Sequence, residues 1–253
     1  MMLGHHRVGT GPRPVVVLND WMGDTSTWDE ASVYLDTSRY TWVFADLRGY
    51  GRSRGRMGRF TLDEAAADVV ELVDHSGFER LAMVGHSMSA LVALHLGQQL
   101  PNRVEAVVVI TPPPPTGFGV DDETLAALQA VGRGDDALRM NGLRRMIGDR
   151  LSESFLRRKV ERWRASSDPE AVAGYVAMYA RHGLPEPSKK IPTRVLAVTG
   201  EQDRDVMRGD AVERWLAPLC DRHIVQRFVD CGHYPMQEMP PRLVAVVEQF
   251  LSG

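Results

Sequence analysis

The chain has 253 residues, a formal net charge of −3, 43% hydrophobic and 25% charged residues, and two cysteines. These values are typical of a soluble globular protein that is long enough to bury the core of one large α/β domain. They exclude a strongly basic surface for nucleic acid or an anionic membrane, and no apolar run approaches the roughly 18 residues of a spanning helix. Since the N-terminal segment lacks the apolar stretch of a secretory signal, we expect a reduced, cytoplasmic protein without a disulfide framework.

Short apolar runs alternate with amphipathic stretches along most of the chain, which predicts a mostly parallel sheet with helices on both faces. Several runs are continuously apolar, as expected of strands that are covered on both sides. After an early strand that carries His5 and His6, we predict strands at 13–19, 40–46, 80–85, 104–111, 194–200 and 223–229. We predict helices between them at 61–75, 87–99, 210–218 and 240–252.

Residues 113–189 interrupt this alternation. The proline-rich segment TPPPPTGFG forms a rigid exit from the sheet, because proline cannot extend a strand or enter a helix interior. We predict helices after it at 121–132, 135–149, 152–166 and 168–182, and interpret the segment as a helical cap inserted into a core of residues 1–112 and 190–253. The basic run LRRKVERWR, 156–164, is interpreted as a solvated helix face with charge pairs four residues apart.

A serine follows the third of the listed strands, in the sequence Gly85-His86-Ser87-Met88-Ser89. A nucleophile presented on a sharp strand-to-helix turn needs small residues two positions before and two after it, so that strand and helix can pass closely. Gly85 and Ser89 meet this requirement, although glycine is usual at the second position. The strand before the motif and the helix after it favour Ser87 as a nucleophile.

Partners for Ser87 follow in the order acid, then histidine. Asp203 lies three residues after the glycine that ends the strand at 194–200, and His233 lies in a glycine-led loop after the last strand. We expect His233 to accept the proton of Ser87 and Asp203 to orient the imidazole. Asp205 is the competing acid. No cluster of histidine, cysteine and acidic residues has the spacing of a metal site, and no cofactor is expected.

Four stretches resemble the motifs of the α/β-hydrolase-fold superfamily, and the resemblance covers almost the whole chain. They are DLRGYGRS at 46–53, GHSMSA at 85–90, GEQDRDV at 200–206 and GHYPMQEMP at 232–240. The resemblance implies a small single-domain serine hydrolase with a helical cap over its site. Members of the family usually begin with two antiparallel strands, so the first of these is expected to be missing or vestigial here.

The resemblance also implies an oxyanion hole built from the backbone N–H groups of Trp21 and Met88. Typical members carry His-Gly before the first of these donors, whereas this chain has Asn19-Asp20. Asp20 is compatible with that place if its backbone is left-handed, a conformation that Asp visits more readily than most residues. We expect Asp20 to pair with Arg48 or to cap the following turn; the alternative is an acidic group at the pocket that selects a polar group of the substrate.

A weaker resemblance links GDTSTW, at 23–28, and GHSMSA to the branch that contains stress-signalling hydrolases and butenolide-hormone receptors, whose caps also have four helices. In the cap, a spacing of three and four residues places four side chains on one helix face. We expect some of them to line the pocket: Tyr175, Met178, Tyr179 and His182.

These observations predict hydrolysis of a small, largely apolar carboxylic ester, lactone or thioester, with a small-molecule substrate as the only partner and a monomer or homodimer as the assembly. Two alternatives stay open because fold analogy does not decide chemistry. One is a ligand sensor of the same fold with slow or single turnover. The other is a cofactor-independent C–C hydrolase, perhydrolase or dioxygenase.

Overall fold

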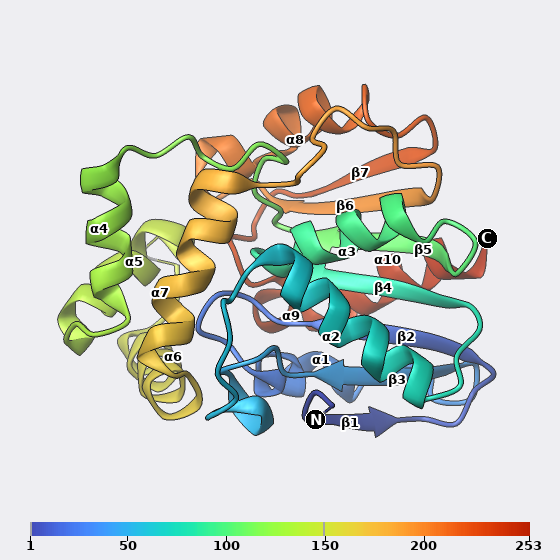
Figure 1. Cartoon of the computed structure of the whole chain (residues 1–253), viewed down its shortest axis with the longest axis horizontal. Coiled ribbons are helices and arrows are strands. Elements are labelled where there is room, and N and C mark those ends of the chain that lie inside the picture. The colour runs from blue at the N-terminus through green and yellow to red at the C-terminus, as the bar shows by residue number, and fades with distance from the viewer. Residues whose placement is uncertain (1, 149) are drawn as a thin grey trace.

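The computed structural model describes residues 2–148 and 150–253, and its centre is a seven-stranded sheet in the order β1-β3-β2-β4-β5-β6-β7. All neighbouring strands are parallel except β1, which pairs antiparallel with β3 at one edge (Figure 1). The strands are β1 (His5–Val8), β2 (Arg13–Leu18), β3 (Tyr40–Ala45), β4 (Leu81–His86), β5 (Val104–Ile110), β6 (Arg194–Gly200) and β7 (His223–Phe228). One strand therefore precedes β2, and the predicted strands agree with the observed ones to within one residue at each end.

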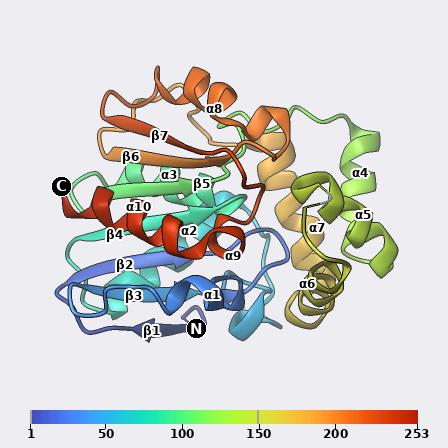
Figure 2. The same cartoon turned by 180° about the vertical axis from the view of Figure 1, so that it is seen from behind.

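Helices cover both faces of the sheet. Figure 1 shows α2 (Leu62–His75) and α3 (Ser89–Gln99) in front of it, and the reverse view in Figure 2 shows α1 (Asp29–Ser32), α9 (Pro235–Glu238) and α10 (Pro240–Ser252) on the other side. The helix α8 (Gly209–Leu216) packs against β6 and β7. The prediction of a mostly parallel sheet with helices on both faces is confirmed.

The central strands are hydrophobic throughout because both of their faces are covered. Val107, Val108 and Val109 of β5 have no measurable exposure. Residues of α3 are likewise buried around the whole helix, including Ala90, Leu91 and Val92, so this helix lies inside the molecule rather than on its surface.

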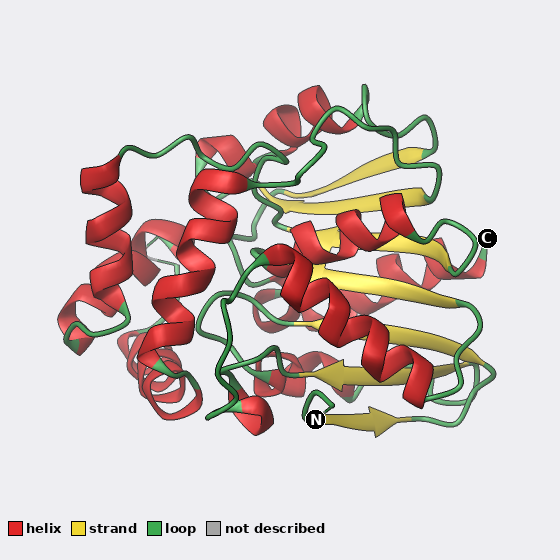
Figure 3. Cartoon of the chain, viewed as in Figure 1, coloured by secondary structure: helices red, strands yellow, loops and turns green. Residues whose placement is uncertain are grey.

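Between β5 and β6 the chain forms helices and loops beyond one end of the sheet, and Figure 3 shows no arrow in this part. The helices are α4 (Asp122–Val131), α5 (Asp136–Ile147), α6 (Glu153–Ser166) and α7 (Pro169–Ala177), followed by a π-helical turn at Met178–His182. Asp121, Asp135 and Ser152 cap the first three, each accepting a backbone N–H three residues later. This helical layer lies at the carboxyl ends of the parallel strands (Figures 1 and 2).

Polar contacts hold the helical layer against the sheet domain. The indole N–H of Trp21 donates to the carbonyl of Val172 at 2.8 Å, and Arg162 of α6 binds the carboxylate of Asp24 through two nitrogens. Arg162 therefore does not form the pair within its own helix that the basic run predicts. Lys159 also departs from that prediction: it is 6% exposed and points inward.

Candidate active site

Ser87 occupies a strained turn between β4 and α3. Its φ is +53°, a left-handed backbone that is uncommon for residues other than glycine. Its amide donates to the carbonyl of Ile110 at 2.8 Å, and the Ser89 hydroxyl lies 3.1 Å from the amide nitrogen of His86. A Cβ at Gly85 would overlap the Ser89 carbonyl and lie 2.8 Å from the Cα of Ala90. The requirement for small residues around the serine therefore has a direct steric cause.

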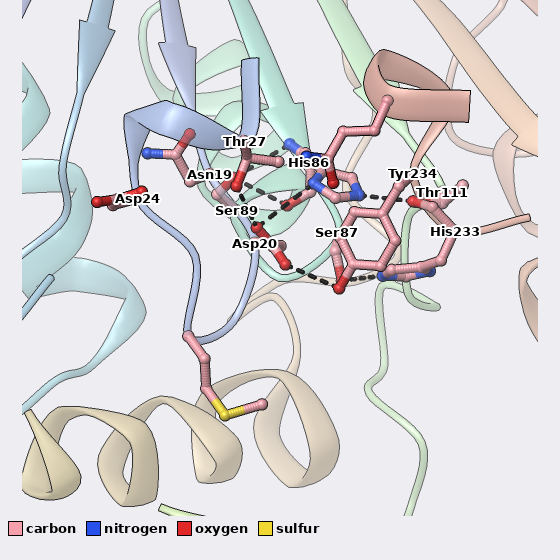
Figure 4. A network of polar contacts seen from close by, with 12 residues as sticks. Asn19, Asp20, Asp24, Thr27, His86, Ser87, Ser89, Thr111, His233 and Tyr234 are labelled. Atoms are coloured by element: carbon pink, nitrogen blue, oxygen red, sulfur yellow. Dashed lines mark hydrogen bonds and ion pairs between the residues drawn. The ribbon is translucent and has the colours of Figure 1, made fainter. Parts of the chain in front are cut away.

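Three side chains from the ends of three strands meet at this turn. Ser87 directly follows β4, Asp203 lies in the turn after β6, and His233 lies in the loop after β7. Nε2 of His233 is 2.9 Å from the Ser87 hydroxyl, and its Nδ1 is 2.6 Å from Oδ2 of Asp203. A carboxylate only accepts hydrogen bonds, so the imidazole hydrogen lies on Nδ1 and Nε2 is left as the acceptor for Ser87. Figure 4 shows Ser87 facing His233.

The competing acid lies elsewhere. Asp205 is exposed and pairs with Arg208 at 2.9 Å, whereas Asp203 is 1% exposed. The second oxygen of Asp203 accepts the backbone N–H of Arg204 at 2.7 Å. Both Asp203 oxygens therefore have donors, which compensates for the burial of the carboxylate.

Asp20 lies beside these residues but not as expected. Arg48 binds Asp68 instead, at 2.6 and 2.9 Å, and the turn after Asp20 is closed by a backbone bond from Gly23 to the Asp20 carbonyl. The left-handed conformation falls on Met22, at φ +69°, and not on Asp20. The expectations of an Arg48 pair and of a side-chain cap were therefore wrong; the carboxylate points to buried partners from distant segments.

The partners of Asp20 are Tyr234, Thr27 and His86 (Figure 4). The Tyr234 hydroxyl donates to Oδ2 at 3.0 Å, while Oδ1 is 3.5 Å from the Thr27 hydroxyl and 3.7 Å from Nδ1 of His86. Burial and the neighbouring carboxylate raise the pKa of Tyr234 well above its usual value. Tyr234 therefore stays protonated and stabilises the Asp20 carboxylate.

Lys159 of α6 supplies the positive charge near Asp20. Its Nζ lies 4.0 Å from the centre of the Tyr234 ring and 2.9 Å from the side-chain oxygen of Gln237. Burial alone would raise the pKa of Asp20, but the Lys159 ammonium brings it below the usual range. A side chain of the helical layer thus balances a carboxylate beside the serine.

His86 lies behind the turn, fully buried, and its Nε2 is 2.8 Å from the carbonyl oxygen of His233. Because a carbonyl only accepts, Nε2 of His86 carries hydrogen. Burial lowers the pKa of His86, which favours the neutral ring. The Thr111 hydroxyl donates to the same carbonyl at 3.2 Å, so two donors hold the backbone of His233 in place.

A cavity of about 320 Å³ opens onto Ser87 and His233. Its wall includes Asp20, Trp21, Tyr179 and Tyr234, and its apolar lining is Pro113, Phe118, Val120, Leu128, Met146 and Met207. A larger polar cavity of about 470 Å³ lies between Asp24, Asp46 and Arg162, away from the serine, and we assign the site by the chemistry of Ser87 rather than by size.

Of the four cap residues expected at the pocket, Tyr179 lines the cavity. Tyr175 instead packs against Tyr50 and Phe60, each at 5.4 Å between ring centres, and is 1% exposed. Met178 is buried away from the cavity and His182 is exposed to solvent. The four residues share a helical spacing, but the π-helical turn at Met178–His182 changes which side chains face inward.

Several residues of the site were not predicted. Tyr234 directly follows His233, and an aromatic residue next to the predicted histidine was an available signal. Lys159 lies in a basic run, but the apolar residues Val160 and Trp163 beside it indicate the buried face of the helix. Their position was also an available signal. Arg204, which directly follows Asp203 and lines the cavity, carried the same kind of signal, whereas nothing in the sequence placed Arg145 there.

The described residues contain no group of three or more histidine, cysteine or acidic side chains arranged to hold a metal ion. Cys231, two residues before His233, is buried, and burial raises the pKa of its thiol, which disfavours the reactive thiolate. None of the helices in the described ranges is long and apolar enough to cross a membrane.

A mostly parallel sheet, a serine on a sharp turn after β4 and a helical layer over the strand ends define an α/β-hydrolase-type protein. Solved structures share this fold: a hydrolase from Oleispira antarctica has a TM-score of 0.86 at 16% identity, covering 99% of this chain and 95% of that one. The enol-lactonase from Burkholderia xenovorans has a TM-score of 0.80 at 22% identity, covering 99% and 96%.

Residues 15–246 match the Alpha/beta hydrolase family, and the chain belongs to that family. Among curated relatives, the 3-oxoadipate enol-lactonase 2 of Acinetobacter baylyi is 28% identical over 108 residues, 42% of this chain and 40% of that protein. The dihydrolipoyllysine-residue acetyltransferase component of the acetoin cleaving system of Cupriavidus necator is 36% identical over 115 residues, 45% of this chain and 29% of that protein. These matches therefore span less than half of each relative.

Proposed function

We propose that the protein is a serine hydrolase that cleaves a carboxylic ester, lactone or thioester through an acyl-enzyme. The observation that carries the proposal is the continuous hydrogen-bonded path from Ser87 through His233 to Asp203, with distances of 2.9 and 2.6 Å, at the wall of a cavity. The names of relatives, which include an enol-lactonase and an esterase, support the same class of bond.

The reaction begins with attack of the Ser87 hydroxyl oxygen on the carbonyl carbon, as its proton passes to Nε2 of His233. Asp203 holds the imidazole in the required tautomer and stabilises the imidazolium. His233 then gives the proton to the leaving alcohol or thiol. A water molecule, deprotonated by His233, attacks the acyl-enzyme and releases the acid and free Ser87.

The tetrahedral oxyanion is stabilised by the backbone N–H groups of Trp21 and Met88. Neither amide donates a hydrogen bond to another residue within the described ranges, so both remain available to a ligand. Asp20 adjoins Trp21, and its negative charge would oppose the oxyanion. Its contacts with Tyr234 and the charge of Lys159 offset that effect.

The test follows nitrophenol release from short and medium p-nitrophenyl esters, through the first turnover and beyond. Sustained release at about 1 per second or faster, the usual range for enzymes, would support the proposal. Ser87→Ala should abolish it, because the variant lacks the hydroxyl that faces Nε2 of His233. Full activity in Ser87→Ala would contradict the proposal, and a burst equal to the enzyme concentration without further release would favour a ligand sensor.

A further inference from the structure

Two arginine side chains line the cavity that contains Ser87. Arg145 comes from α5 in the helical layer, and Arg204 directly follows Asp203 in the sheet domain. Both side chains are exposed, so they lie toward the opening of the cavity, whereas Ser87 is half-buried. A substrate that enters the cavity therefore passes two positive charges before it reaches the serine.

Neither arginine has an acidic partner in the part of the chain that the structure describes, unlike arginines close to them in sequence. Arg144 pairs with Glu153, and Arg208 pairs with Asp205 at 2.9 Å. The Arg204 guanidinium lies 5.0 Å from the centre of the Phe118 ring, another residue of the cavity wall. The stacking holds the guanidinium at the wall and leaves its N–H groups without a carboxylate acceptor.

The remaining wall does not balance these two charges. The one carboxylate among the described lining residues is Asp20, which is 1% exposed and accepts the hydroxyl of Tyr234. Burial raises the pKa of Tyr179, so that its hydroxyl is neutral. Most of the other lining side chains are apolar, including Phe118, Met146 and Met207.

We propose that the substrate is an ester or lactone that carries a carboxylate at some distance from the bond that is cleaved, and that Arg145 and Arg204 bind this carboxylate. The apolar wall contacts the hydrocarbon chain between this carboxylate and the cleaved bond. The proposal rests on the proposed serine hydrolase function and changes the expected substrate from largely apolar to anionic. A guanidinium is well suited to this task because it can bind a carboxylate through two parallel hydrogen bonds.

The experiment compares mono-p-nitrophenyl adipate with p-nitrophenyl methyl adipate, which differ at the distal end by a negative charge. The wild-type kcat/KM should favour the anionic ester by about tenfold at low ionic strength, the size expected for hydrogen bonds to a charged group. The preference should fall as salt screens the exposed guanidinium groups.

Arg145→Gln and Arg204→Gln should each lower the ratio of kcat/KM for the anionic ester to kcat/KM for the methyl ester about threefold or more, because only the anionic end loses a charged partner. Arg157→Gln is the matched control: Arg157 is an exposed arginine of the helical layer that does not line the cavity. This control should leave kcat/KM for both esters unchanged.

The outcomes separate the two proposals. Equal kcat/KM for the two esters in wild type, or an anionic preference that both cavity variants retain, would overturn the carboxylate proposal while the hydrolase proposal stands. Failure of wild type to release nitrophenol from either ester would overturn both. If Arg157→Gln lowers the anionic preference as much as the cavity variants do, the preference comes from the overall electrostatic field of the molecule. That result would also overturn a specific role of the cavity arginines.

Discussion

Two buried aspartate–histidine pairs lie in the same site, and only one forms a hydrogen bond. Asp203 is 2.6 Å from Nδ1 of His233, while Asp20 is 3.7 Å from Nδ1 of His86, too far for a hydrogen bond. His86 donates its Nε2 hydrogen to the carbonyl of His233, and the nitrogen that faces Asp20 then has only a lone pair. An acid beside a histidine thus supports proton transfer only when the facing nitrogen carries hydrogen.

The two carboxylates also differ in what balances their charge. Asp203 accepts from His233 and from the backbone of Arg204, both on loops of the sheet domain. Asp20 depends on the Tyr234 hydroxyl and on Lys159, which comes from α6. The first carboxylate is therefore held within one layer of the molecule, whereas the second links the helical layer to the site.

Among changes to the two pairs, the largest effect should come from Asp203→Asn, which should lower kcat by about 10⁴-fold because His233 loses the group that fixes its tautomer. Asp20→Asn is the matched change in the other pair and should alter kcat/KM by less than about tenfold, since no hydrogen bond joins Asp20 to His86. Steady-state hydrolysis of one p-nitrophenyl ester measures both variants.

Similar losses in the two variants would show that Asp20 takes part in the reaction. A small loss of kcat in Asp203→Asn would mean that another carboxylate orients His233. Circular dichroism of each variant distinguishes a loss of catalysis from a loss of fold.

The two pairs also differ in how much of their arrangement could be predicted from the sequence. Ser87, Asp203 and His233 each follow a strand closely, and parallel strands bring their carboxyl ends to one edge, so their meeting could be predicted. Asp20 also follows a strand closely and Tyr234 follows His233, so the same edge could be expected for them, but the sequence did not indicate that the Asp20 carboxylate accepts the Tyr234 hydroxyl. The short helices α1 and α9 were missed because four residues are too few for a helical period to appear.

The next largest effect concerns stability. Lys159→Met should lower the free energy of unfolding by about 3 kcal/mol, because it leaves the buried Asp20 carboxylate without its positive neighbour. The double variant Lys159→Met with Asp20→Asn should lose at least about 0.5 kcal/mol less unfolding free energy than the two single variants lose together, since the two groups interact. Urea unfolding measures all three variants, with Arg157→Met as the control on the exposed side of α6.

Strict additivity in this cycle would contradict the interaction between Lys159 and Asp20. Lys159 would then be held by its contacts with Gln237, Thr27 and the ring of Tyr234. The helical layer would still contact the site, but it would not balance the charge of Asp20.

The smallest effect should appear in acid. The pKa of Asp20 is lowered in the folded protein, whereas an aspartate in the unfolded chain titrates near about pH 3.9. A lowered folded pKa gives stability that is present above the unfolded value and is lost as the pH falls through the folded value. The unfolding free energy of wild type minus that of Asp20→Asn should therefore shrink as the pH falls from about 6 to about 3.

Urea unfolding at a series of pH values measures this difference, and titrating groups that do not interact with Asp20 cancel because both proteins contain them. Asp205→Asn, which removes an exposed carboxylate, is the control for the loss of one negative charge. A difference that grows toward low pH would mean that the folded site favours the protonated form of Asp20. Burial would then outweigh Lys159, and Asp20, unlike Asp203, would be neutral beside the serine.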